Sequence, residues 1–214
     1  MRLVLVDVDG TLLEGTSSER RFFRHLLRRG LLGPAQLGAF LAFAVRHRRR
    51  YGADVWKKDK AYLAGLRLEP VAAEAERFVA RRLLPAVRPV MRRRIEGHRA
   101  AGDVLALLTG TPAFLARPLA EALAIPHVIA TRCDLRAGRF TAAPPPVHPY
   151  GAEKERLARA LAAELRLPLE EAVAYADSAS DRPLLAAVGE AVAVHPDTGL
   201  RSEARGLGWE ILGG

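Results

Sequence analysis

The sequence predicts an α/β protein: a doubly wound, Rossmann-like parallel sheet with an inserted helical cap domain. Three observations predict this fold class. Short apolar runs bounded by Gly, Pro or Asp recur along the chain, as expected for parallel strands that are covered on both faces. Helical patterns lie between these runs, which indicates crossover connections. One long interval, 16–85, shows no strand pattern and reads as helices throughout.

The expected strands and helices alternate along the rest of the chain. The strand patterns cover 2–8, 103–110, 127–133, 172–177 and 190–196. The helical patterns between them cover 88–101, 113–124, 152–166 and 181–188. The segment 134–142, "DLRAGRFTA", is typical of a hairpin at the margin of the sheet.

The interval 16–85 predicts four helices in a separate lobe. The helical patterns cover 17–30, 35–50, 53–66 and 69–85. Ser17 or Ser18 can cap the first helix, and Gly33 and Pro34 separate it from the second. We therefore expect a core domain formed by 1–15 and 86–214, and a cap domain formed by 16–85 that lies over the carboxyl edge of the sheet.

Composition limits the class of protein and of partner. The chain has 214 residues, with 33 Lys and Arg against 24 Asp and Glu and a net charge of +9, which favours anionic partners such as phosphoesters, nucleic acid or acidic lipid headgroups. The single cysteine, Cys133, excludes an internal disulfide. The first apolar run ends at Asp7 and the longest later one covers 37–45, too short to cross a bilayer. We expect a soluble, cytoplasmic protein.

Two carboxylates follow the first strand in "DVDGT". Asp7 and Asp9 are two residues apart, so an extended chain points both to one side, at the edge where α/β sheets bind ligands. Two carboxylates about 4 Å apart repel by roughly 4 kcal/mol at an effective dielectric near 20, which requires compensation. Gly10 allows a sharp turn, and Thr11 offers a hydroxyl and an amide. The alternative is a strand exit in which both Asp side chains accept backbone amides.

Other strand ends bring further polar groups to the same edge. "LALLTG" places Thr109 and Gly110 there, and "AYADSASD" places Asp177 and Asp181. Converging carboxylates require a divalent cation, and an all-oxygen set of ligands favours Mg²⁺. Asp181 also precedes Pro183 in "SDRPLL", a pattern typical of a helix N-cap, and we expect it to serve both roles.

Lys154 begins the helix "AEKERLARALAAEL" and is the only lysine outside 16–85. A compact ammonium group at this position can approach a carboxylate and a phosphoryl oxygen together, which explains a lysine in an arginine-rich chain. The alternative is a solvated side chain that pairs with a neighbouring Glu.

These motifs resemble the haloacid dehalogenase superfamily, in particular the subgroup with a helical cap that includes phosphoserine phosphatases. "DVDGT", the "TG" after a strand, the Lys154 helix and "DSASD" occur in the family's order and spacing, over nearly the whole chain. The resemblance implies that Asp7 is a nucleophile that forms an aspartyl-phosphate, and that Asp9 is the general acid and base. The presence of Asp9 also argues against dehalogenation.

The resemblance assigns roles to the other site residues as well. Thr109 and Lys154 would hold the phosphoryl oxygens. Mg²⁺ would be bound by Asp7, the backbone carbonyl of Asp9 and Asp177, with Asp181 ordering the outer ligands. The remaining expected contacts to the phosphorylated substrate come from Gly10, Thr11, Gly110 and Thr16. The implied activity is Mg²⁺-dependent hydrolysis of a phosphomonoester.

The cap is expected to determine the substrate. Phosphoserine phosphatases carry a Glu nine residues after the nucleophile; here Thr16 occupies that position, and Glu14 and Glu19 are off register. We therefore expect a small or lipid-like phosphomonoester, with phosphoserine as an alternative. Transfer of the phosphoryl group to an alcohol, by a phosphotransferase or mutase, stays open.

The basic segment of the cap leaves more than one interpretation open. "LGAFLAFAVRHRRR" (37–50) joins an apolar stretch to a basic cluster, which indicates either a helix packed within the cap or peripheral contact with an anionic membrane. A catalytically inactive basic module that binds nucleic acid or a membrane is the rival class, but no groove-reading motif supports a nucleic-acid partner.

His148 and His195 fall in loops that can border the cleft. The sequence predicts no oligomeric state.

Overall fold

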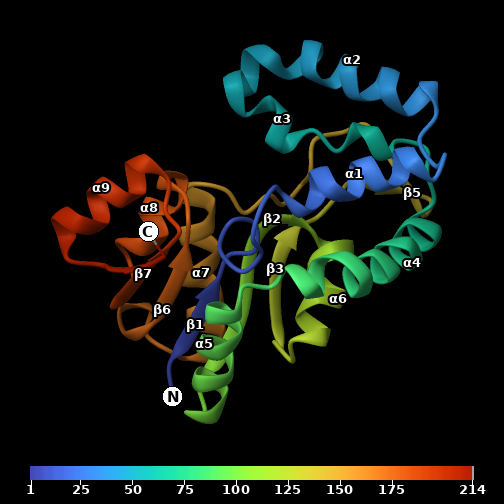
Figure 1. Ribbon diagram of the computed structural model, residues 1–214. Coiled ribbons are helices and arrows are strands. Elements are labelled where there is room, and N and C mark those ends of the chain that lie inside the picture. The colour runs from blue at the N-terminus through green and yellow to red at the C-terminus, as the bar shows by residue number, and fades with distance from the viewer. Residues whose placement is uncertain (214) are drawn as a thin grey trace.

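The computed structural model describes residues 1–213, apart from the side chain of Ala53. Its main sheet has six parallel strands in the order β3-β2-β1-β6-β7-β8 (Figure 1). The strands are β1 (Leu3–Val6), β2 (Val104–Pro112), β3 (His127–Thr131), β6 (Val173–Ala176), β7 (Glu190–Val194) and β8 (Glu210–Leu212). The predicted doubly wound parallel sheet is confirmed.

Alternation along β1 shows that both faces of the sheet are covered. Val4 and Val6 belong to one apolar cluster, which includes side chains of α5 (Pro89–Ala100) and α6 (Ala113–Ala122). Leu3 and Leu5 belong to a second cluster on the opposite face. This second cluster includes side chains of α7 (Ala152–Leu165), α8 (Arg182–Leu185) and α9 (Thr198–Leu207).

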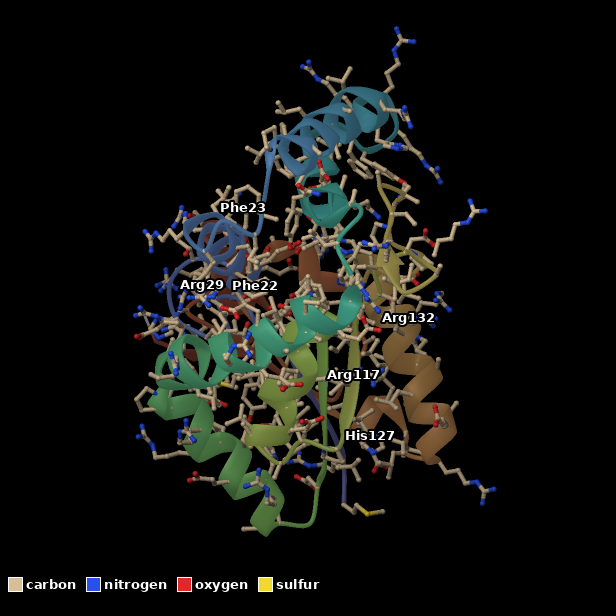
Figure 2. All side chains as sticks on the ribbon, turned by 90° about the vertical axis from the view of Figure 1, so that its right-hand side faces the viewer. Phe22, Phe23, Arg29, Arg117, His127 and Arg132 are labelled. Carbon is tan, nitrogen blue, oxygen red and sulfur yellow. The ribbon has the colours of Figure 1, made fainter. Side chains whose placement is uncertain are left out.

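The inserted segment lies beyond the carboxyl ends of the strands, as Figure 1 shows. Its helices are α1 (Ser18–Arg28), α2 (Pro34–Tyr51), α3 (Val55–Lys58) and α4 (Leu68–Phe78), and a π-helical turn and a 3₁₀ turn lead back to the core. Phe22 of α1, labelled in Figure 2, lies with its ring centroid 5.3 Å from that of Phe78 and 5.6 Å from that of Phe114. This aromatic contact joins α1, α4 and α6, so the inserted helices share the apolar core of the sheet.

The predicted hairpin is present, whereas one predicted helix is broken. β4 (Leu135–Arg136) pairs antiparallel with β5 (Arg139–Phe140). The expected helix over 53–66 is wrong: a 3₁₀ turn precedes α3, and a second 3₁₀ turn (Ala61–Leu63) follows an interruption. Asp59 causes the break, because its backbone is extended and its carboxylate accepts the N–H of Ala61 at 2.9 Å.

The end of the chain contains two elements that the sequence did not predict. α9 begins after Asp197, whose side chain accepts the N–H of Leu200, and β8 adds a short edge strand beside β7. β8 has three residues and is only partly buried, so it carries a weak apolar pattern. Within residues 1–213, no helix combines the length and the apolar character that a membrane crossing requires.

Candidate active site

Three carboxylates meet at the carboxyl edge of the sheet. Asp7 follows β1 and Asp177 follows β6, and these strands are neighbours, while Asp181 ends a 3₁₀ turn just beyond β6. One carboxylate oxygen of each residue lies within 4.8 Å of the corresponding oxygens of the other two. The structure therefore brings together three of the four residues for which the sequence predicted a metal role.

Lys154 provides the positive charge at this cluster. It lies in the first turn of α7 and is buried, and its Nζ donates to Asp7 Oδ1 and to Asp181 Oδ2, each at 2.8 Å. Burial alone would lower the pKa of Lys154, but the adjacent Asp7 and Asp181 charges raise it above its ordinary value. Lys154 is therefore a permanent cation that points at the expected nucleophile.

One lysine does not balance three carboxylates. Burial, together with the charges of Asp7 and Asp181, raises the pKa of Asp177 to about 7. Burial also raises the pKa of Asp181, and its Oδ1 is buried without a hydrogen-bond partner. An unpartnered carboxylate oxygen, in a cluster where three carboxyl groups share one ammonium, fits a bound Mg²⁺.

Asp9 points away from the carboxylate cluster. Its Oδ1 accepts the main-chain N–H of Ser18 at 2.7 Å, and its Oδ2 accepts the hydroxyl of Thr111 at 3.2 Å. Burial raises the pKa of Asp9. Its carboxylate is therefore held between the core strand β2 and the first turn of α1, outside the set of oxygens that could hold a metal.

The N-terminus of α1 depends on the same contact. Ser17 is the N-cap residue, as predicted, but its side chain makes no capping hydrogen bond, nor does that of Asp181 at the start of α8. Asp9 instead satisfies the Ser18 N–H. Asp181 turns its carboxylate to Lys154, so the prediction that it also caps a helix through its side chain is wrong.

The residues that follow Asp9 shape the floor of the site. Gly10 has a φ of +87°, and a Cβ there would lie 2.0 Å from Asp177 Oδ2, so only glycine fits. Thr11 donates its hydroxyl to Asp177 Oδ1 at 3.3 Å. On β2, Thr109 donates its hydroxyl to Thr111 Oγ1 at 3.1 Å, and Gly110 lies beside it.

A cavity of about 640 Å³ opens above these groups and extends to the inserted helices. Asp7, Asp9, Thr109, Gly110 and Lys154 line its core side. Of the other expected substrate contacts, Gly10, Thr11 and Thr16 do not line it, and Thr16 is exposed in the loop before α1. Several residues at the start of α1 enter the cavity instead, among them Glu19, the second residue of the helix.

The wall formed by the inserted helices contains a buried charged group that sequence analysis missed. Lys60 Nζ donates to Glu19 Oε2 at 2.5 Å, and the Tyr62 hydroxyl donates to Glu19 Oε1 at 3.0 Å. Asp59 lines the same wall; its Oδ2 is buried without a partner, and burial raises its pKa to about 7. The sequence signal was the group of three lysines within 57–60, in a segment that we expected to be one continuous helix.

His148 also lines the cavity, as its position in a loop predicted, whereas His195 does not. The Thr131 hydroxyl donates to the Gly110 carbonyl at 2.6 Å, so its oxygen is left to accept from His148 Nδ1, 2.9 Å away. Burial and the nearby lysines lower the pKa of His148 to about 3. The ring is therefore neutral with its proton on Nδ1, and Nε2 is a buried acceptor without a partner.

Comparison with known proteins points to one family. The family model for haloacid dehalogenase-like hydrolases matches residues 4–186. The phosphoserine phosphatase SerB1 of Mycobacterium tuberculosis is 30% identical over 213 residues, 96% of this chain and 68% of that protein. The histidinol-phosphatase of Neisseria meningitidis is 28% identical over 217 residues, 98% of this chain and 97% of that protein.

Solved structures agree with this match. A crystal structure of a Bordetella pertussis protein of unknown function superimposes with a TM-score of 0.84 at 30% identity, over 99% of this chain and 98% of that one. Other curated mycobacterial relatives match over less than half of their own length, 41%.

Proposed function

Because the chain belongs to the haloacid dehalogenase-like hydrolase family, we propose that it is a Mg²⁺-dependent phosphomonoester hydrolase with Asp7 as its nucleophile. One observation carries the proposal. Asp7 lies at the floor of a cavity, 2.8 Å from the Lys154 ammonium and within 4.8 Å of two further carboxylates, while Asp9 stands apart with a raised pKa. A nucleophile and a separate proton donor are the two groups that an acyl-phosphate mechanism needs.

The proposed reaction has two steps. A carboxylate oxygen of Asp7 attacks phosphorus and the bond from phosphorus to the leaving oxygen breaks, while Asp9 gives its proton to that oxygen. Water then attacks the phosphorus of the aspartyl-phosphate, Asp9 takes a proton from it, and inorganic phosphate and the Asp7 carboxylate are released. The raised pKa of Asp9 suits a group that must hold a proton in one step and accept one in the next.

The surrounding residues stabilise charge during both steps. Lys154 and Thr109 line the cavity beside Asp7 and would bind the phosphoryl oxygens. Asp7, Asp177 and the backbone carbonyl of Asp9 would hold the metal, and Asp181 would order its outer ligands. Bound Mg²⁺ would neutralise negative charge on the phosphoryl group.

The distal wall favours a small leaving group that carries hydrogen-bond donors. Asp59 Oδ2 and His148 Nε2 are both acceptors without partners. The Glu19 carboxylate is paired with Lys60, and Arg20, Arg24 and Lys57 also line the cavity. The two unpartnered acceptors are the groups that an ammonium-bearing phosphomonoester would complement. The two relatives named above bear the names of histidinol-phosphatase and phosphoserine phosphatase, whose substrates both carry an amine.

Phosphoserine stays a specific candidate, because a carboxylate enters the cavity from a position three residues after the one where phosphoserine phosphatases carry their Glu. Thr16, at the expected position, is outside the cavity, but Glu19 presents a carboxylate to it from α1. A lipid-like substrate is less compatible with this wall, because Asp59 and Lys60 are buried polar side chains.

The test compares p-nitrophenyl phosphate, O-phosphoserine, histidinol phosphate and the amine-free glycerol 3-phosphate. We expect phosphate release that requires Mg²⁺, is abolished by EDTA and is lost in Asp7→Asn. We also expect a higher kcat/KM for the amine-bearing esters than for glycerol 3-phosphate, and a smaller difference in Asp59→Asn. Full activity of Asp7→Asn would refute the mechanism, and equal kcat/KM values would refute the substrate class. A phosphorylated product formed from an added alcohol would indicate a phosphotransferase instead.

A further inference from the structure

A row of exposed aliphatic side chains runs along the outer face of α2. Leu37, Leu41 and Val45 are 38%, 60% and 82% exposed, and their spacing of four residues places them on one face of the helix. The opposite face supplies the packing: Phe43 is buried in an apolar cluster with Val55 and Ala61. The fold therefore uses one face of α2 and leaves a second apolar face in solvent.

The same part of the chain is strongly basic. Residues 20–53 contain no Asp or Glu and nine arginines: Arg20, Arg21, Arg24, Arg28, Arg29, Arg46, Arg48, Arg49 and Arg50. The last four follow the apolar row in the final turns of α2, and all four are exposed. Ion pairs among the described residues of the inserted segment use other cations, such as Arg29 and Lys60.

α2 is accessible to a large, flat partner. Figure 1 shows it at the outer end of the molecule, separated from the sheet by α1 and α3. An exposed aliphatic row that ends in a cluster of arginines without ion-pair partners among residues 1–213 is complementary to a partner that is both apolar and negatively charged.

We propose that the outer face of α2 docks on the surface of an anionic lipid bilayer. The helix lies in the plane of the interface, with Leu37, Leu41 and Val45 at the acyl boundary and the arginine cluster 46–50 against headgroup phosphates. A second copy of this chain would offer the arginines no carboxylate from its own α2, because residues 20–53 contain no Asp or Glu. Nucleic acid would leave the aliphatic row uncovered, since base stacking uses aromatic side chains.

The test measures co-sedimentation of the full-length protein with vesicles of phosphatidylcholine alone and of phosphatidylcholine mixed with phosphatidylserine. We expect binding to the anionic vesicles that weakens as salt is added, and little binding to the neutral ones. Arg48→Glu/Arg49→Glu should lower the partition coefficient by roughly twentyfold or more, because each basic residue near the surface contributes about 1 kcal/mol, a fivefold effect. Val45→Ser should lower it by roughly fivefold.

Matched controls come from exposed residues elsewhere. Arg81→Glu/Arg82→Glu makes the same change of charge at two consecutive exposed arginines outside α2. Leu207→Ser removes a side chain that is 58% exposed on α9. Both should bind vesicles more tightly than their α2 counterparts. Hydrolysis of p-nitrophenyl phosphate should be unchanged in the α2 variants, so failure of docking is separable from failure of the proposed function.

Three results would overturn the proposal. One is the absence of binding to anionic vesicles at low salt. Another is a concentration-dependent dimer, seen by light scattering, that Val45→Ser dissociates, which would assign the face to a second copy. The third is tight binding to an oligonucleotide that Arg48→Glu/Arg49→Glu abolishes and Val45→Ser leaves intact.

Discussion

The Asp9 carboxylate accepts the main-chain N–H of Ser18 at 2.7 Å, which ties the proposed proton donor to the first turn of α1. The contact joins the loop after β1 to the helix that carries Glu19 and Phe23 into the cavity. The positive end of the helix dipole offsets part of the cost of burying the Asp9 charge. One hydrogen bond therefore links the proposed proton donor to the helix that forms part of the cavity wall.

Asp9→Asn should abolish turnover while preserving the fold. The amide oxygen can still accept the Ser18 N–H, but the side chain can no longer exchange a proton with the leaving group or with water. We expect kcat to fall by roughly 10²–10⁴-fold with a nearly unchanged melting temperature. Steady-state kinetics on p-nitrophenyl phosphate and a thermal melt give both values. A variant with wild-type kcat would exclude Asp9 as the proton donor.

Lys154→Met should destabilise the metal-free protein. The change leaves Asp7, Asp177 and Asp181 together without their buried cation, which costs roughly 3–5 kcal/mol. Urea denaturation in EDTA measures this loss in the free energy of unfolding, and added Mg²⁺ should restore part of it. Lys57→Met is the control, because that side chain is 51% exposed and should change stability by less than about 1 kcal/mol. Equal effects of the two changes would contradict the proposed charge balance.

Gly10→Ala should impair metal binding in a way that Gly30→Ala does not. Both glycines have positive φ, so each change costs about 1–2 kcal/mol of backbone strain. A Cβ at Gly10 would also collide with the Asp177 carboxylate, whereas one at Gly30 meets no atom within 4 Å. We expect the Mg²⁺ concentration for half-maximal activity to rise roughly tenfold in Gly10→Ala alone. The same Mg²⁺ requirement in both variants would argue against a metal role for Asp177.

Asp59 should make stability depend on pH. Its pKa is raised to about 7 by burial, against about 4 in the unfolded chain, so the folded state binds the extra proton between these values. The stabilisation is complete below about pH 4 and is lost as pH rises through about 7, at up to about 1.4 kcal/mol per pH unit. Between pH 5 and pH 8, wild type should lose about 2.5 kcal/mol relative to Asp59→Asn in urea denaturation. Parallel pH profiles would show that Asp59 is ionised in the folded protein.

The fold and the floor of the site could be predicted because they depend on local signals. Asp7, Thr109 and Asp177 each follow an apolar run, and the carboxyl ends of parallel strands share one edge whatever their order. The pairing of β1 with β6, which brings Asp7 to Asp177, is a long-range contact that the sequence pattern leaves open. The prediction that Asp7 and Asp177 lie together did not need this pairing, because it used only the fact that both strands end at the same edge of the sheet.

The wall above the site could not be predicted because irregular backbone forms it. Asp59 breaks the helix expected over 53–66 and lines the cavity. Lys60 is buried and bonded to Glu19. The choice of buried face on α2 was equally open. Its apolar residues occupy several sides of the helix, and packing against α3 buries Phe43 while Val45 stays exposed.

The central claim is that Asp7 attacks phosphorus, and the most direct measurement is to locate the phosphate. Wild type and Asp9→Asn are mixed with substrate and Mg²⁺, quenched in acid, reduced with borohydride and digested for mass spectrometry. Reduction of an aspartyl-phosphate converts that residue to homoserine, so we expect homoserine at position 7 and at no other aspartate. Labelling of a different residue, or substrate turnover by an Asp7→Asn protein, would contradict the mechanism.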